Sequence, residues 1–132
     1  MSGPIVFISH NVVLDGKLRI FREAFAGVAE ALDAEKPGTV VFLAYADDDG
    51  TEVSVVHVFP DAEAMGLHLQ GVEERMAVAA GSIQTTGYEI YGSPGEQVLE
   101  AMRGFAGSLG VPLQVRGDHV GGYLRPRSPA PG

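Results

Sequence analysis

The sequence has no cysteine and no tryptophan among its 132 residues. Without cysteine there is no disulfide framework, no thiolate nucleophile and no cysteine-ligated zinc or iron–sulfur site. Basic residues are also few, with 9 against 17 acidic ones, which gives a net charge of −8. Nucleic acid and anionic lipid attract proteins through clustered Lys and Arg. We therefore expect neither nucleic acid nor a membrane surface as a partner.

Long apolar runs are missing as well. No stretch reaches the roughly 18 apolar residues of a transmembrane helix, and no basic segment precedes an apolar one at the N-terminus. These absences predict a soluble, cytoplasmic protein. One domain over residues 1–125 is long enough to bury a core without a metal or a disulfide. Residues 126–132 contain three of the prolines and no core-forming side chain, so we expect a disordered tail.

The hydrophobic pattern alternates between strand and helix periods along the chain. Apolar, β-branched runs predict strands at Ile5–Val13, Thr39–Ala46, Glu52–Phe59, Tyr88–Tyr91 and Leu113–Leu124. Three- and four-residue spacings predict three helices, one from Gly16 to Pro37 with Asp15 as N-cap, one from Asp61 to Ile83, and one from a Ser93–Glu96 capping box to Gly110. This order predicts an α+β, ferredoxin-like antiparallel sheet with helices on one face, extended by a C-terminal helix and strand.

Two strands are apolar on both faces. Val41 and Leu43 alternate with Phe42 and Ala44, and the strand from Glu52 to Phe59 repeats the pattern. A sheet covered by helices on one side only should be polar on the other side. Since two-fold dimers are the commonest oligomers, a second copy of the same sheet is the expected cover. The sequence thus predicts a homodimer.

The segment from Leu14 to Gln70 resembles the antibiotic biosynthesis monooxygenase superfamily of dimeric α+β barrels. The residues that carry the resemblance are Asp15-Gly16-Lys17, Phe25, Lys36-Pro37-Gly38, Val55, Phe59 and the run Asp61-Ala62-Glu63-Ala64-Met65-Gly66-Leu67-His68-Leu69. Members of this superfamily include oxygenases of polycyclic phenols or quinols that use no metal or flavin, haem-degrading enzymes and sugar isomerases. Haem degradation is disfavoured, because those members resemble one another in a strand Asn and in a Trp and a His on the second helix. Asn11 fits the first of these features, but the chain has no Trp.

His68 is the candidate catalytic residue. It lies at the edge of the apolar stripe of its predicted helix, where an imidazole can face a cleft between helix and sheet. The resemblance makes it a general base toward a phenolic substrate, since the reference pKa of histidine, about 6.5, lies near working pH. The alternative is a boundary histidine bonded to a backbone carbonyl.

Further polar and aromatic residues are candidates for contacting a small aromatic or apolar substrate, namely Asn11, Tyr45, His57, Tyr88 and Tyr91. Each can instead be an ordinary core residue. No metal is expected, because no two histidines have helical i, i+4 spacing and no local ligand motif is present. The resemblance implies no cofactor.

Two functions remain open. The first is a cofactor-independent monooxygenase of an aromatic polyketide-like or quinol substrate. The second is a non-catalytic dimer that binds a small apolar ligand or fills its interior with its own side chains. A cavity beside His68 separates them, because large residues such as Phe7, Phe42 and Phe59 can fill that space.

Overall fold

The chain forms one five-stranded sheet with four helices, shown by a computed structural model that describes residues 3–125. The strands are β1 (Ile5–Val13), β2 (Val41–Ala46), β3 (Glu52–Phe59), β4 (Ile83–Tyr91) and β5 (Leu113–Arg116). The helices are α1 (Leu18–Glu35), α2 (Ala62–Leu69), α3 (Val72–Ala79) and α4 (Glu96–Leu109). Among the described residues, no helix is long and apolar enough to cross a membrane. The expected tail, residues 126–132, lies outside this range.

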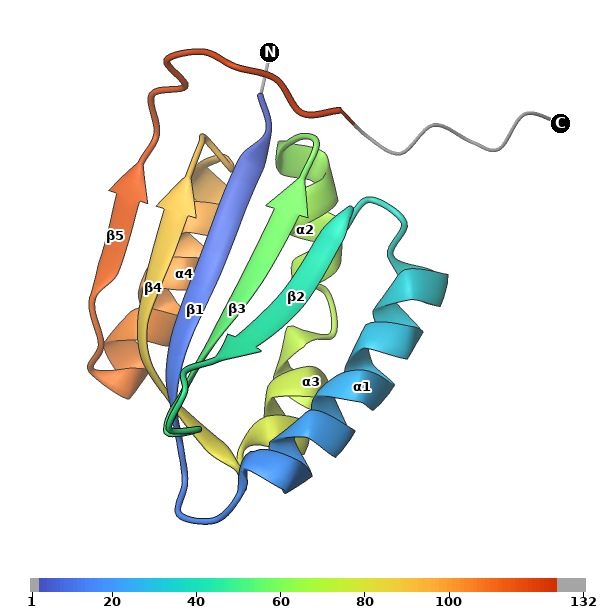
Figure 1. Ribbon diagram of the computed structural model, residues 1–132. Coiled ribbons are helices and arrows are strands. Elements are labelled where there is room, and N and C mark those ends of the chain that lie inside the picture. Colours follow the sequence, from blue (N-terminus) through green and yellow to red (C-terminus); the bar gives the residue numbers. More distant parts are fainter. Residues whose placement is uncertain (1–2, 126–132) are drawn as a thin grey trace, which may run out of the picture.

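The sheet has the strand order β2-β3-β1-β4-β5, and in Figure 1 α2 and α4 lie behind the strands while α1 and α3 lie at the right. This confirms the ferredoxin-like α+β fold with helices on one face. The sheet is mixed rather than wholly antiparallel, because α4 carries the chain back across it and β5 pairs parallel with β4. Its two edges, β2 and β5, do not meet, so one chain alone forms no closed barrel.

The core between sheet and helices is divided into two clusters. One joins β1, β3 and β4 to α2 and α4, with Ile5, Phe59 and Ile90 fully buried. The other joins β3 to α1 around Phe21 and Val53. Alternation along β1 and β3 directs every second side chain to this covered face of the sheet. The space between the clusters is where the candidate site lies.

The prediction of one continuous second helix is wrong. The helix is broken into α2 and α3 at Gln70 and Gly71, where Gln70 is extended and Gly71 has a φ of +81°. Glycine adopts this left-handed conformation without the steric cost that other residues carry. Ile83, expected at the end of this helix, instead begins β4.

Two helix N-caps were predicted, at Asp15 and Ser93, and neither forms, whereas Asp61, predicted only as the start of a helix, does cap one. The Asp61 carboxylate accepts a hydrogen bond from the Ala64 N–H at 2.9 Å at the start of α2. Asp15 does not cap α1, whose N-cap is Lys17 without a side-chain bond. Ser93 does not cap α4 either, since its hydroxyl donates to the Gly117 carbonyl at 2.9 Å and the N-cap is Gly95.

Three strand boundaries also differ from expectation, and the smallest difference is in β2, which begins at Val41 rather than Thr39. β4 begins five residues earlier than predicted, at Ile83 rather than Tyr88, because the helix that was expected there has already ended. β5 ends at Arg116, before Gly117, rather than at Leu124. Glycine weakens a strand interior, and three glycines follow within the next six residues.

Candidate active site

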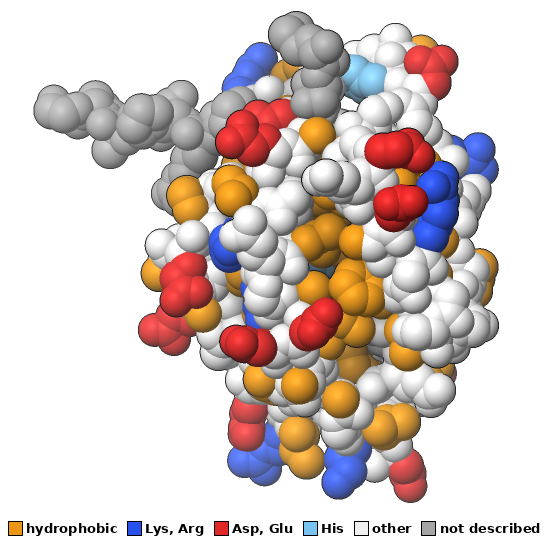
Figure 2. All heavy atoms as spheres, turned by 180° about the vertical axis from the view of Figure 1, so that it is seen from behind, with side chains coloured by type: hydrophobic (Ala, Val, Ile, Leu, Met, Phe, Trp, Pro, Cys, Tyr) orange, Lys and Arg blue, Asp and Glu red, His pale blue; other side chains and the backbone are white. Residues whose placement is uncertain are grey.

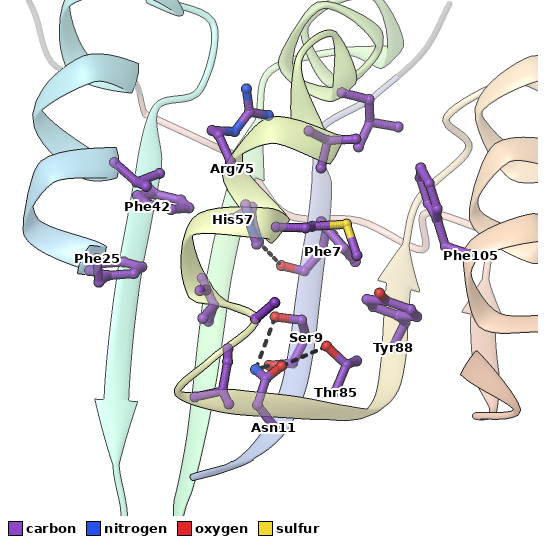
Figure 3. A pocket seen from close by; sticks show the side chains of 18 of the residues that line it. Phe7, Ser9, Asn11, Phe25, Phe42, His57, Arg75, Thr85, Tyr88 and Phe105 are labelled. Carbon is purple, nitrogen blue, oxygen red and sulfur yellow. Dashed lines mark hydrogen bonds between the residues drawn. The ribbon is translucent and has the colours of Figure 1, made fainter. Parts of the chain in front are cut away.

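A cavity of about 360 Å³ lies between the covered face of the sheet and the four helices. Seen from the helix side, hydrophobic side chains surround a hollow in the centre of the molecule (Figure 2). Phe25 of α1 stacks on Phe42 of β2 at 4.6 Å on one side, and Tyr88 and Phe105 stand on the other (Figure 3). The volume is that of a small-molecule pocket.

One end of the cavity is polar and fully hydrogen-bonded. The Asn11 side-chain nitrogen donates to the Val53 carbonyl at 3.2 Å, and the Asn11 oxygen accepts from the Thr85 hydroxyl at 2.8 Å. Ser9 lies within 3.4 Å of the same amide nitrogen (Figure 3). Asn11 therefore lines the cavity as predicted, but it is already held by three neighbours.

A β-bulge in β4 places Thr85 in this network. His10 of β1 pairs with Gly87, whereas Asn11 pairs with Thr85, so Thr86 is an extra residue. One extra residue reverses which side chains face the helices. As a result, Tyr88 and Thr85, which alternation would put on opposite faces, both line the cavity.

Two histidines lie side by side at another part of the cavity wall. The His57 and His68 rings meet edge to face with centroids 5.1 Å apart. Nδ1 of His57 donates to the Phe7 carbonyl at 2.9 Å, which leaves Nε2 as the unprotonated nitrogen. Nδ1 of His68 is 2.8 Å from the Thr39 hydroxyl, a group that can donate or accept, so this contact fixes no tautomer. Both histidines line the cavity, and among residues 3–125 no buried side-chain nitrogen or oxygen lacks a partner.

Both histidines are held in the neutral form. Burial, helped by the charge of Arg75, lowers the pKa of His57 to about 4, although the Phe7 hydrogen bond opposes the shift. Burial also lowers the pKa of His68 to about 3, with smaller contributions from His57, Arg75 and Lys36. At neutral pH each ring therefore keeps one unprotonated nitrogen, which is Nε2 in His57 and either ring nitrogen in His68.

Arg75 is a lining residue that the sequence interpretation missed. It is on α3, and its guanidinium bonds back to α2 by donating to the carbonyls of Gln70, at 3.1 Å, and His68. The break at Gly71 folds the start of α3 against the end of α2 and makes these contacts possible. The sequence signal was available, because a Gly two residues after the last helical position commonly ends a helix.

Two predicted substrate contacts lie away from this cavity. Tyr45 is 63% exposed on β2, and Tyr91 donates a hydrogen bond to Glu89 at 2.5 Å on the sheet face without helices. Tyr45 lies three residues after Phe42, and Tyr91 lies three residues after Tyr88, with no bulge between them. Because side chains alternate along a strand, both tyrosines face away from the cavity. Of the predicted residues, the cavity brings together Asn11, His57, His68 and Tyr88.

Metal ligands do not gather within residues 3–125. No group of three or more His, Asp or Glu side chains lies close enough there to hold an ion. The polar groups at the cavity are two imidazoles, an amide, hydroxyls and a guanidinium, which suit proton transfer and anion stabilisation rather than metal binding.

No protein-family model and no curated protein sequence matches the chain. Solved structures do match. MupZ from Pseudomonas fluorescens has a TM-score of 0.72 at 20% identity, over 97% of this chain and 99% of its own. SnoaB from Streptomyces nogalater, a cofactor-independent oxygenase, has a TM-score of 0.58 at 18% identity, over 71% and 96%. A putative antibiotic biosynthesis monooxygenase from Caulobacter crescentus has a TM-score of 0.58 at 17% identity, over 67% and 86%. The chain therefore shares its fold with all three structures, among them the putative antibiotic biosynthesis monooxygenase.

Proposed function

We propose that this chain is a cofactor-independent monooxygenase that oxidises an aromatic, polyketide-like or quinol substrate with dioxygen. The observation that carries the proposal is the cavity, whose aromatic walls enclose two uncharged imidazoles. The fold shared with SnoaB supports it. A hydroxyanthrone illustrates the chemistry. Its CH₂ carbon loses two hydrogens and becomes a carbonyl, one oxygen atom enters that carbonyl, and the other leaves as water. The substrate thus supplies all the electrons, and no external reductant is needed.

His68 is the base in this mechanism. It removes a proton from the substrate, and the resulting carbanion or phenolate is electron-rich enough to react with dioxygen. A base must be unprotonated at working pH, which burial ensures for His68. The substrate anion formed beside the imidazolium raises the proton affinity of the ring, because an opposite charge favours the charged form. Nε2 of His57 lies on the same wall as a second acceptor.

The protein acts as a homodimer in this proposal, with a second copy on the sheet face that has no helices. We call this the open face and define it by Val6, Ile8, Val41, Leu43, Tyr45, Val56 and Val58. Leu43 is 47% exposed, although burying it would be favourable. Sheet-to-sheet pairing of two identical chains is isologous and covers the same residues on both.

A non-catalytic ligand-binding protein is the second candidate. The hydrogen bonding of Asn11 favours it, because all three of its contacts are internal and none is left waiting for a substrate. A binding protein needs the cavity but no base.

Oxygen consumption with a hydroxyanthrone tests the function. We expect His68→Ala to lower the rate by about 10²- to 10⁴-fold, the usual cost of losing a positioned general base. His119→Ala is the matched control, since His119 is exposed and outside the cavity. Equal rates in the parent protein and His68→Ala would refute the role of the base. Binding without turnover by the parent protein, over a panel of phenols and anthrones, would instead support the binding protein.

A further inference from the structure

Arg75 is the one formally charged residue among those that line the cavity within residues 3–125. The remaining lining side chains are apolar, aromatic or uncharged polar groups, and burial keeps both histidines neutral. Arg75 is therefore a single, partly buried cation on the wall of a largely apolar cavity.

No carboxylate neutralises this cation at close range. Among the described residues, no Asp or Glu oxygen lies within 4 Å of Arg75. Glu35 and Glu74 act on it only through longer-range attraction, and burial lowers its pKa from the usual value. The guanidinium remains protonated, because the reference pKa of arginine exceeds about 12.

The hydrogen-bonding capacity of Arg75 is also only partly used. A guanidinium has five N–H donors, and those of Arg75 serve two uncharged backbone carbonyls, on His68 and Gln70. These contacts hold the planar group in place at the junction of α2 and α3. Donors that are already oriented lose little entropy when an anion arrives, and charge-assisted bonds are roughly twice as strong as neutral ones.

We propose that the cavity selects a planar aromatic ligand with an anionic group, such as a carboxylate or an acidic enolate, which pairs with Arg75 while the rings lie among the aromatic side chains of the walls. This names the substrate class of the site in the proposed function and rests on that function for its catalytic meaning. Selectivity for binding stands separately. The net charge of −8 repels an anion, so preference for one must come from a local cation.

A matched pair of probes tests the selectivity. 8-Anilinonaphthalene-1-sulfonate is anionic, and N-phenyl-1-naphthylamine has the same ring skeleton without the sulfonate. Fluorescence titration gives the ratio of their affinities. We expect Arg75→Met to lower this anionic-to-neutral ratio by about tenfold or more, with the neutral probe nearly unaffected, and Arg75→Lys to keep most of the preference. Arg19→Met is the control, because the Arg19 side chain is 91% exposed on α1. An unchanged ratio in Arg75→Met overturns the proposal.

The location of the probes needs its own variant, since the open face of the sheet is also apolar. Ala79 lines the cavity, so Ala79→Phe should fill part of it and weaken both probes. If the anionic probe binds Ala79→Phe as tightly as the parent protein, it occupies another site and the proposal fails. Melting temperatures show whether each variant is folded. Should Arg75→Met unfold, Arg75→Lys decides, because loss of the anionic preference in that folded variant counts against charge recognition.

The two hypotheses fail separately. A shift of the ratio in Arg75→Met, without oxygen consumption on any hydroxyanthrone, would leave anion selectivity standing and remove the monooxygenase. Oxygen consumption together with an unchanged anionic-to-neutral affinity ratio in Arg75→Met would support the monooxygenase and refute anion selectivity.

Discussion

The two faces of the sheet are both rich in apolar residues, yet they differ in what covers them. On the helix side, Phe59, Met65 and Ile90 are fully buried, and the space left between two core clusters is the cavity. On the open face, Leu43 and Tyr45 are largely exposed. The polar contacts of this face are concentrated toward β4, where His10 pairs with Glu89 at 2.5 Å. The covered face forms a cavity within one chain, whereas no described element of that chain covers the open face.

The largest expected effect is on the open face. Leu43→Asp puts two uncompensated carboxylates into the proposed sheet-to-sheet interface, one from each copy. Burying an unpaired charge costs about 3–5 kcal/mol, so the dissociation constant should rise by at least 100-fold. Sedimentation or light scattering of the parent protein and the variant measures this. A parent protein that stays monomeric at 13.9 kDa up to high concentration would contradict the dimer.

A pair of identical substitutions compares the faces directly. Ile90→Ala removes a fully buried side chain from the covered face, and the free energy of unfolding should fall by about 2–5 kcal/mol. Ile8→Ala removes a half-buried one from the open face and should cost clearly less in the monomer. Urea denaturation at several protein concentrations measures both values. If the Ile8→Ala cost grows with concentration while the Ile90→Ala cost does not, a second copy covers Ile8.

The third comparison concerns the acid sensitivity of the covered face. His57 and His68 have lower pKa values in the folded chain than the unfolded value of about 6.5, so the unfolded state binds more protons below that pH. Stability should be constant above about pH 6.5 and fall toward pH 4, by at most about 1.4 kcal/mol per pH unit for each histidine. His68→Gln should roughly halve the slope, and His119→Gln should leave it unchanged. A flat profile between pH 6.5 and 4 in the parent protein would show that neither ring is buried neutral.

The hydrophobic periodicity of the sequence, together with its turn-forming residues, was sufficient to predict the fold class. Strand runs and helical spacings gave the order of elements and the covered side, because apolar burial dominates the free energy of folding. Strand alternation also predicts that Tyr45 and Tyr91 face away from the cavity, because each lies three residues from a cavity-facing side chain, Phe42 or Tyr88. Both tyrosines were candidates because an aromatic ring with one hydroxyl group suits a ligand cavity, which is a criterion that takes no account of strand parity.

Other features depend on contacts distant in the chain. His68 was placed beside a cleft, but its pairing with His57 requires β3 and α2 to meet, and its contact with Thr39 joins residues 29 positions apart. Arg75 lines the cavity one turn after the helix breaks at Gly71. The hydrophobic pattern continues across Gly71, so it predicts one helix. That pattern reflects which side chains are buried and does not reveal a change in backbone conformation at a glycine.

The bulge at Thr86 makes the polar end of the cavity tolerant of a change in chain length. His10 pairs with Gly87 and Asn11 pairs with Thr85, so Thr86 is extra to both pairs. Deleting Thr86 would restore regular alternation and leave Tyr88, Thr85 and Ile83 on the covered face. A related chain that lacks this one codon would therefore keep the hydrogen bond from Thr85 to Asn11, with no change in any residue that touches a ligand.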